Sequence, residues 1–180
     1  MPARASPRRD ELLERAYLYV LDHGVADISL RPLAAAVGSS PRVLLFLFGS
    51  KAGLVQALLA RARQDELALL DRARAAGDLL AAATEVWRWL AAEEHRGLLH
   101  LWVEGYARSL IDPDGAWAGF AAATVADWLE VLGGLTNDPA EPTLILAVLR
   151  GALLDLLATG EARRVGEAVD RQLELLRRAA

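Results

Sequence analysis

Residue types that carry out catalysis or bind metals are scarce in this chain of 180 residues. Cysteine is absent, which excludes disulfides, thiolate nucleophiles and zinc-cysteine sites. The three histidines, His23, His95 and His100, form no H-E-x-x-H pair and flank no serine or paired carboxylates spaced for nucleophilic catalysis. A contact between His100 and Glu104, one helical turn apart, fits a solvated pair better than a metal site. We therefore expect no enzyme, no metal and no cofactor.

A different group of residues is suited to binding a polyanion. The small-residue turn Gly38-Ser39-Ser40 separates two short apolar segments, and Arg42 and Lys51 follow it. The arginine fork can pair with O6 and N7 of guanine, whereas a lysine ammonium acts as a point charge for phosphate. Lys51 is the only lysine in the chain. These residues indicate contact with nucleic acid.

The distribution of charge agrees with a localised contact. The formal net charge is −4 at pH 7, which argues against a protein that coats nucleic acid along its whole surface. The first 51 residues carry seven basic and five acidic side chains, whereas the remainder carries 13 basic and 19 acidic ones. A basic N-terminal part on an acidic body is expected if only one end meets a polyanion.

The elements that must position these residues are helices. Apolar residues recur with a helical period almost throughout, and glycine and proline mark the ends of the segments. We predict an all-α fold of about nine helices, three short ones followed by six longer ones. The expected helices are Pro7 to about His23, Leu30–Val37, Pro41–Phe48, Lys51 to about Ala76, Asp78–Glu94, Gly97–Leu110, Asp114–Leu132, Glu141–Ala158 and Glu161–Arg178.

The second and third of these helices, with the turn between them, have the arrangement of a helix-turn-helix, whose second helix lies in the major groove of DNA. We assign residues 1–50 to a DNA-binding domain and residues 51–180 to a ligand-binding and dimerisation domain. Phe46 and Leu47 either contact thymine methyl groups or pack in the core. The predicted DNA-binding residues are Ser29, Arg31, Ser39, Ser40, Pro41, Arg42, Leu45, Phe46, Leu47 and Lys51.

Here the sequence resembles the TetR family of one-component transcriptional regulators. The most specific piece is F-G-S-K-A-G-L at Phe48–Leu54. The resemblance implies that Phe48 fills the core of the three-helix unit, that Ser50 caps the fourth helix and that Lys51 contacts a phosphate. The other matching residues are Leu13, Ala16, Leu21, Gly24, Ser29, Leu33, Ala34, Val37, Gly38, Ser40 and Leu44.

The predicted reading helix also departs from the pattern common in that family. Arg42 stands where a glycine is usual, and Leu45 and Leu47 stand where hydroxyl or imidazole side chains usually bind phosphate. The chain therefore resembles a variant subgroup. Of the reading-helix residues, Arg42 is the best candidate for reading a base.

A short reading helix contacts few base pairs, so specificity requires two half-sites and a two-fold dimer. The last two helices offer an apolar seam, and the resemblance implies that they form a four-helix interface with a second copy. In the alternative, these residues only close the core of the single chain. The predicted interface residues are Leu144, Val148, Ala152, Leu156, Val165, Val169, Leu173 and Leu176.

The middle helices hold most of the aromatic residues, interleaved with alanine and glycine. Such a group can line an apolar cavity with a few polar tips, although aromatic stripes are more often ordinary core. With the family resemblance, we expect an effector cavity here. Its predicted lining residues are Trp87, Trp102, Tyr106, Trp117, Phe120, Thr124 and Trp128.

These observations predict a repressor that binds a palindromic operator in double-stranded DNA as a homodimer and is released by a small apolar effector. The apolar stretches 116–126 and from Leu144 onward are interrupted by charge and too short to span a membrane, and no secretory signal is visible, so we expect a cytoplasmic protein. One alternative remains, a family member that binds a ligand without specific DNA binding. A second, an all-α enzyme acting on an apolar substrate, is disfavoured because no nucleophile and base are spaced for it.

Overall fold

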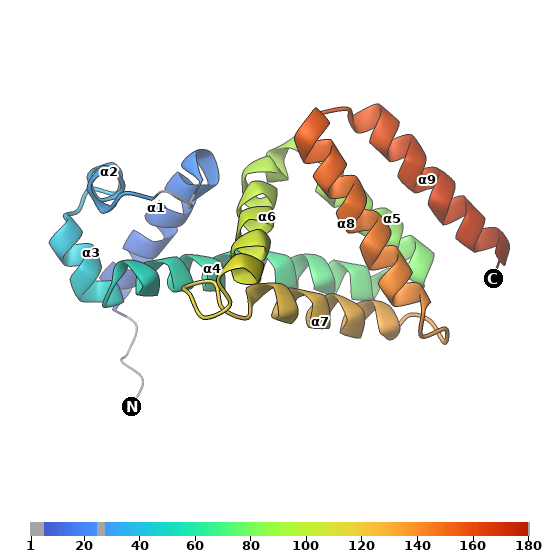
Figure 1. The fold of residues 1–180 in the computed structure, drawn as a ribbon, viewed down its shortest axis with the longest axis horizontal. Coiled ribbons are helices and arrows are strands. Elements are labelled where there is room, and N and C mark those ends of the chain that lie inside the picture. Colours follow the sequence, from blue (N-terminus) through green and yellow to red (C-terminus); the bar gives the residue numbers. More distant parts are fainter. Residues whose placement is uncertain (1–5, 25–27, 180) are drawn as a thin grey trace. The chain divides into compact units, whose positions relative to one another are not determined.

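The computed structural model describes residues 6–24 and 28–179, and all regular structure in these two ranges is helical (Figure 1). The all-α prediction is confirmed. The helices are α1 (Pro7–His23), α2 (Leu30–Ala36), α3 (Pro41–Phe48), α4 (Lys51–Ala75), α5 (Leu79–Ala91), the 3-10 helix η1 (Glu93–His95), α6 (Arg96–Ile111), α7 (Phe120–Gly133), α8 (Glu141–Thr159) and α9 (Ala162–Ala179).

The chain divides into two compact units. The first comprises the residues up to Gln64 together with His100–Ala121, and the second comprises Asp65–Leu99 together with the residues from Ala122 onward. Helices α4 and α6 each contribute to both units. The predicted boundary at residue 50 separates functions rather than compact units, and it stays a prediction.

The first unit has the core expected of a helix-turn-helix. Helix α2 packs on both α1 and α3, and Figure 1 shows these short helices together. Each helix turns a stripe of apolar residues, spaced by three or four, toward the others. The buried side chains are Leu12, Ala16, Tyr17 and Val20 of α1, Leu33 and Ala34 of α2, Val37 after it, Leu44 and Phe48 of α3, and Leu54, Val55 and Leu58 of α4.

The second unit is built around α5, α8 and α9, which pack against one another in pairs (Figure 1). Helix α5 is capped by Asp78, whose carboxylate accepts a hydrogen bond from the amide of Ala81 at 2.8 Å. Helix α9 turns Val165, Val169 and Leu173, spaced by four, into this unit, and each is at most 4% exposed. One face of α9 therefore belongs to the unit's own core.

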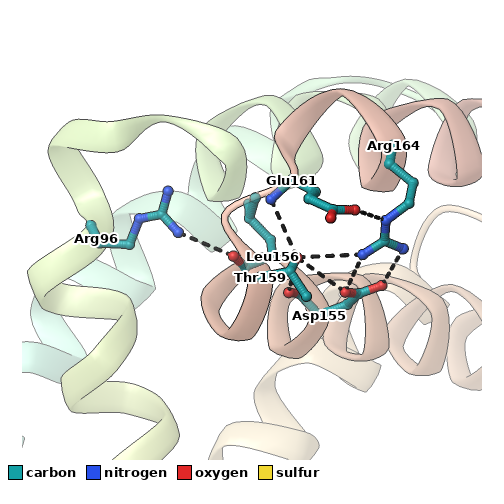
Figure 2. A network of polar contacts seen from close by, with 6 residues as sticks. All are labelled: Arg96, Asp155, Leu156, Thr159, Glu161 and Arg164. Atoms are coloured by element: carbon teal, nitrogen blue, oxygen red, sulfur yellow. Dashed lines mark hydrogen bonds and ion pairs between the residues drawn. The ribbon is translucent and has the colours of Figure 1, made fainter.

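A polar network closes the turn between α8 and α9 (Figure 2). Gly160 adopts a left-handed backbone conformation and donates to the carbonyl of Leu156, which ends α8. The guanidinium of Arg164 then donates two hydrogen bonds to the carboxylate of Asp155, at 2.6 and 2.8 Å, and another to Glu161. Arg96 donates to the carbonyl of Leu156 at 3.3 Å, so the start of α6 is joined to the same turn.

Two of the predicted helices were wrong in extent. The segment expected to start at Asp114 forms turns until Phe120, because Gly119 adopts a positive φ of 75° and Pro113 and Gly115 favour turns. The expected helix 78–94 is broken at Ala92, whose extended backbone separates α5 from η1. The other predicted ends agree with the structure to within two residues.

Helix α8 is unusual among the described helices because its length and hydropathy match those of a membrane span. It has 19 residues with a mean hydropathy of 1.6 over its most apolar window, only 28% of which is buried within the chain. The helix is longer than the uninterrupted apolar stretch in the sequence, since Arg150 and Asp155 lie within it. Because it packs on α5 and α9, α8 is a core helix with one uncovered side.

The α8–α9 network generates a prediction about Asp155. Hydrogen bonding to Arg164 holds the pKa of the Asp155 carboxyl below its usual value. The pair therefore stabilises the folded chain at neutral pH, and its contribution is lost as the pH falls through the lowered pKa. In a carboxyl NMR titration, Arg164→Ala should raise the pKa of Asp155 toward about 3.9, the unperturbed value.

A matched control is Arg163→Ala, because Arg163 pairs with Glu167 rather than with Asp155. That variant should leave the titration of Asp155 unchanged. An Asp155 carboxyl that titrates identically with and without the Arg164 guanidinium would contradict the prediction.

Candidate nucleic-acid interface

The turn between α2 and α3 is fixed by its own backbone and by one serine. Gly38 has a φ of +68°, and the amide of Ser39 donates to the carbonyl of Ala34 at 2.8 Å, which ends α2. The Ser40 hydroxyl accepts a hydrogen bond from the amide of Val43 at 3.3 Å, which caps the start of α3. The sequence predicts Ser40 as a DNA contact, and in the structure its hydroxyl caps α3.

Helix α3 has one buried face and one outward face. Leu44 and Phe48 are buried, at 1% and 8% exposure. The opposite side carries Arg42, Val43, Leu45 and Phe46, all exposed, and Phe46 is 85% exposed. We define these four residues as the outward face of α3. Of the two alternatives for Phe46, core packing is therefore wrong, whereas Leu47 is half-buried.

The junction between α3 and α4 sets the direction in which this face points. The two helices bend by 70° across Gly49 and Ser50, and Gly49 has a φ of +79°. The Ser50 hydroxyl caps α4 by accepting from the amide of Gly53 at 2.9 Å, as the resemblance implies. A Cβ on Gly53 would lie 2.1 Å from the carbonyl oxygen of Phe48, so only glycine fits this backbone contact.

Helix α1 is held to α4 in the same unit by a second contact. Arg61 donates to the carboxylate of Glu14 at 2.7 Å, and its guanidinium lies 4.6 Å from the centre of the Tyr17 ring. Arg9 of α1 lies over the ring of Phe48 at 4.9 Å. Together these contacts place α1 behind α3, on the side away from the outward face.

The segment of the chain that contains the outward face is basic. From Ile28 to Gln64 the chain has five basic residues and no aspartate or glutamate. Within this stretch Arg31, Arg42 and Lys51 are exposed, and Lys51 is the first residue of α4. A surface of this composition favours a polyanion.

The remaining predicted DNA-binding residues lie close by in the chain and differ in exposure. Ser29 is exposed and precedes α2 without a side-chain cap, and Ser39 and Pro41 are half-buried. Sequence reasoning missed Val43, which is 39% exposed beside Arg42. Its position on α3 next to the buried Leu44 was the sequence feature that could have indicated an exposed side chain.

The predicted effector residues fall into both units. In the first unit, Trp117 and Phe120 are buried against Gly105, where a Cβ would lie 3.1 Å from each ring. The buried hydroxyl of Ser109 accepts from the amide of Ala121 and donates to the carbonyl of Tyr106, each at 3.1 Å. Trp102, like Tyr106, is half-buried.

In the second unit, a buried carboxylate accompanies the predicted residues. The indole of Trp128 donates to Glu66 at 3.0 Å, and Glu66 is 1% exposed. Thr124 lies one turn before Trp128 on α7, and its hydroxyl is buried with no hydrogen bond in the described chain. Trp87 instead packs beside Gly166 of α9. Sequence reasoning missed Glu66 because nothing in a helical pattern distinguishes a buried glutamate from an exposed one.

Two open surface depressions occur in the second unit, with volumes of about 550 and 360 Å³. The larger lies between the end of α4 and α5, and the smaller lies around the segment 133–143. Neither is lined by a predicted effector residue, so the effector cavity stays a prediction. Within residues 6–24 and 28–179, no cluster of three potential metal ligands occurs.

The predicted dimer residues divide into buried and exposed sets. Leu156, Val165, Val169 and Leu173 are at most 4% exposed because they pack within the second unit, so they are not available to a second copy. Leu144 is 40% exposed, and Val148, Ala152 and Leu176 are half-buried. The exposed apolar stripe of α8, spaced by three and four, consists of Leu144, Ala147, Gly151, Leu154 and Ala158.

Solved structures with the same fold are bacterial regulators and a drug-binding protein. A transcriptional regulator from Rhodococcus sp. Rha1 aligns with a TM-score of 0.77 at 21% identity, covering 96% of this chain and 97% of its own. A Rhodococcus sp. protein assigned to the TetR family aligns with a TM-score of 0.69 at 18% identity, covering 94% and 96%.

The multidrug binding protein EbrR, complexed with proflavin, aligns with a TM-score of 0.67 at 25% identity, covering 91% of this chain and 98% of its own. No family model and no curated protein matches the sequence. The chain therefore has the fold of TetR-family transcriptional regulators.

The backbone contact at Gly53 predicts that a substitution by alanine destabilises the protein, although the same substitution usually stabilises a helix. Replacing an exposed helical glycine by alanine normally stabilises a helix by about 1 kcal/mol. Here the added methyl group would meet the Phe48 carbonyl oxygen, so Gly53→Ala should lower the free energy of unfolding by about 1–3 kcal/mol. Urea unfolding followed by circular dichroism measures the change.

Gln56→Ala is the matched control, because Gln56 is an exposed residue of the same helix. It should change the free energy of unfolding by less than about 0.5 kcal/mol. A Gly53→Ala protein more stable than the parent would show that residue 53 and the Phe48 carbonyl oxygen are not in this close contact.

Proposed function

We propose that this chain is a ligand-responsive transcriptional repressor that binds a palindromic operator as a homodimer and is released by a small apolar effector. The observation that carries the proposal is the capped, outward-facing α3 in a stretch without acidic residues. The TetR-type fold supports it, since solved neighbours with this fold are transcriptional regulators.

In the proposed complex, α3 lies in the major groove and α2 crosses the backbone. Arg42 projects from the first turn of α3 and pairs with a guanine, whereas Lys51 at the start of α4 binds a phosphate. Both side chains are exposed, and neither forms an ion pair within the described residues, so neither must break an internal contact to reach DNA. Arg31 and Ser39 supply further phosphate contacts.

The proposed dimer uses the side of α8 that the single chain leaves uncovered. Its stripe from Leu144 to Ala158 is apolar and contains Gly151, where a Cβ would meet nothing within 4 Å. Small residues at this spacing let two helices approach closely. On α9 the corresponding exposed residues are Ala168 and Leu175. Pairing this surface across a two-fold axis would account for the span-like hydropathy of α8 in a soluble, cytoplasmic protein.

The effector is proposed to act through α4. This helix begins with the proposed phosphate ligand Lys51 and continues without interruption to the buried Glu66 and beyond. Effector binding beside Trp128 would shift α4 and change the separation of the two reading helices. The effector releases DNA only if it prefers the DNA-incompetent state, and a preference of about 1–3 kcal/mol is typical of allosteric coupling.

The alternative function is a ligand-binding protein without specific DNA binding. The observation that favours it is the apolar character of Val43, Leu45 and Phe46, which supply no hydrogen bond to a phosphate. A titration of operator and scrambled duplexes over a series of salt concentrations separates the two functions. Equal affinity for both duplexes would remove the repressor proposal and leave the alternative.

Two substitutions should affect DNA binding differently. Arg42→Ala should weaken binding to the operator by about 5- to 150-fold per half-site, the effect of losing one bidentate base contact in each protomer, and should scarcely affect scrambled DNA. Lys51→Ala should weaken binding to all duplexes and reduce the slope of log K against log salt by about 2, one phosphate in each protomer. Fluorescence anisotropy measures both.

Arg171→Ala is the matched control, because Arg171 is an exposed arginine of α9 that pairs with Glu174. It should change neither affinity nor the salt slope. If Arg42→Ala weakened binding to operator and scrambled duplexes by the same factor, Arg42 would not read a base.

A charge placed on the α8 stripe should separate the proposed dimer. Leu154 is 48% exposed and lies in the middle of the stripe, so Leu154→Glu would bury two carboxylates in the interface. The variant should sediment as a monomer at micromolar concentration, where the parent sediments as a dimer. Leu110→Glu, which changes a leucine of α6 that is 66% exposed, should stay dimeric. A parent protein that is monomeric in analytical ultracentrifugation would contradict the interface.

A further inference from the structure

The outward face of α3 carries the most exposed large apolar side chain among the described residues. Phe46 is 85% exposed, and Val43 and Leu45 beside it are each 39% exposed. The ring does not contribute to the core of its own unit, in which the same helix buries Leu44 and Phe48. Phe46, Val43 and Leu45 together give one side of α3 an apolar surface, which favours a partner that covers it.

This face can form few hydrogen bonds to a base. Arg42 is the only one of its four residues with a polar side chain, so base-edge recognition beyond Arg42 must rest on apolar contact. In the major groove, the apolar group that a side chain can meet is the 5-methyl group of thymine.

We propose that Phe46 recognises the 5-methyl group of thymine, so that each operator half-site is read by a methyl contact next to the arginine contact. This inference rests on the proposed function. It deepens that function by naming the feature of the DNA that the helix selects.

The charges around Phe46 favour DNA over an apolar protein partner. Phe46 lies within the stretch from Ile28 to Gln64, which has five basic residues and no acidic ones. Arg42 lies one turn before Phe46 and Lys51 lies at the start of the next helix, so a ligand that covers the ring also meets both charges. A double helix supplies the apolar methyl groups and the phosphates together.

The spacing of Arg42 and Phe46 also predicts how far apart the two contacted bases lie. Arg42 and Phe46 are four residues apart on α3, which places them about 6 Å apart along the helix axis. Successive base pairs are about 3.4 Å apart. The guanine bound by Arg42 should therefore lie within about two base pairs of the thymine contacted by Phe46.

The test compares one operator with and without thymine methyl groups. The full-length protein first selects its operator from a pool of random duplexes. The same operator is then made with deoxyuridine in place of every thymidine, which removes the methyl groups and keeps the base pairing. Loss of one buried methyl in each half-site should weaken binding by about fourfold per half-site and about fifteenfold for the dimer, measured by anisotropy.

A double-mutant cycle assigns the effect to Phe46. In Phe46→Ala, the ratio of the affinities for the thymine and uracil operators should fall to near one, because no ring remains to meet the methyl groups. Leu110→Ala, which removes an exposed apolar side chain outside the helix-turn-helix, should keep the full ratio. Circular dichroism checks that both variants are folded.

This experiment gives different results when the methyl contact is wrong and when the proposed repressor function is wrong. Equal affinity of the parent protein for the thymine and uracil operators, with scrambled DNA bound more weakly, would overturn the methyl contact and leave the repressor intact. A ratio unchanged by Phe46→Ala would overturn the role of Phe46. Selection that recovers no duplex bound better than scrambled DNA would overturn the methyl contact together with the proposed function.

Discussion

The contact between the Phe48 carbonyl oxygen and the backbone of Gly53 determines how the first unit presents its surface. A side chain at residue 53 would occupy the space of that oxygen, at 2.1 Å, so the close approach of α3 to α4 depends on a glycine. Gly49 and Ser50 make the same junction possible, the first by its positive φ and the second by capping α4. Because α3 has only eight residues, a change in the angle between α3 and α4 would change the direction of the whole helix.

With the junction fixed, the division of α3 into two faces follows from helical geometry. Phe48 and Leu44 lie one turn apart and enter the core, so Arg42 and Phe46 must lie on the opposite side. The core position of Phe48 is secured from behind by Arg9 of α1. The outward face is therefore rigidly positioned without polar contacts of its own, which leaves its side chains available for a ligand.

Much of the fold could be predicted from the sequence, because helical periodicity and helix breakers are local signals. The core positions of Leu33, Leu44 and Phe48 follow from spacing, and Ser50 is recognisable as a cap. The start of α7 was mispredicted because alanine-rich residues after Pro113 have helical composition although turns fill the segment to Gly119. A local sequence pattern does not show whether helix-favouring residues or turn-favouring residues determine the structure of such a segment.

The sequence indicated which helices carry the candidate site, but it said less about which sides of those helices are exposed. Periodicity identified the apolar side of α9 but could not say which chain covers it, and Val169 packs within its own unit. The same limit applies to Glu66, whose burial depends on α7, far away in the sequence. Exposure of Phe46 needed the orientation of α3 relative to its neighbours, which no local pattern specifies.

The arginine-rich composition of the chain has a practical consequence at the start of α4. Since Lys51 is the only lysine, its ε-amine is the single side-chain target for amine-directed reagents. A fluorophore, crosslinker or isotope label attached through this amine would sit just after α3 in the chain without any engineered residue. The chain therefore has one natural attachment point for such a label, at the start of α4 and close in sequence to the outward face of α3.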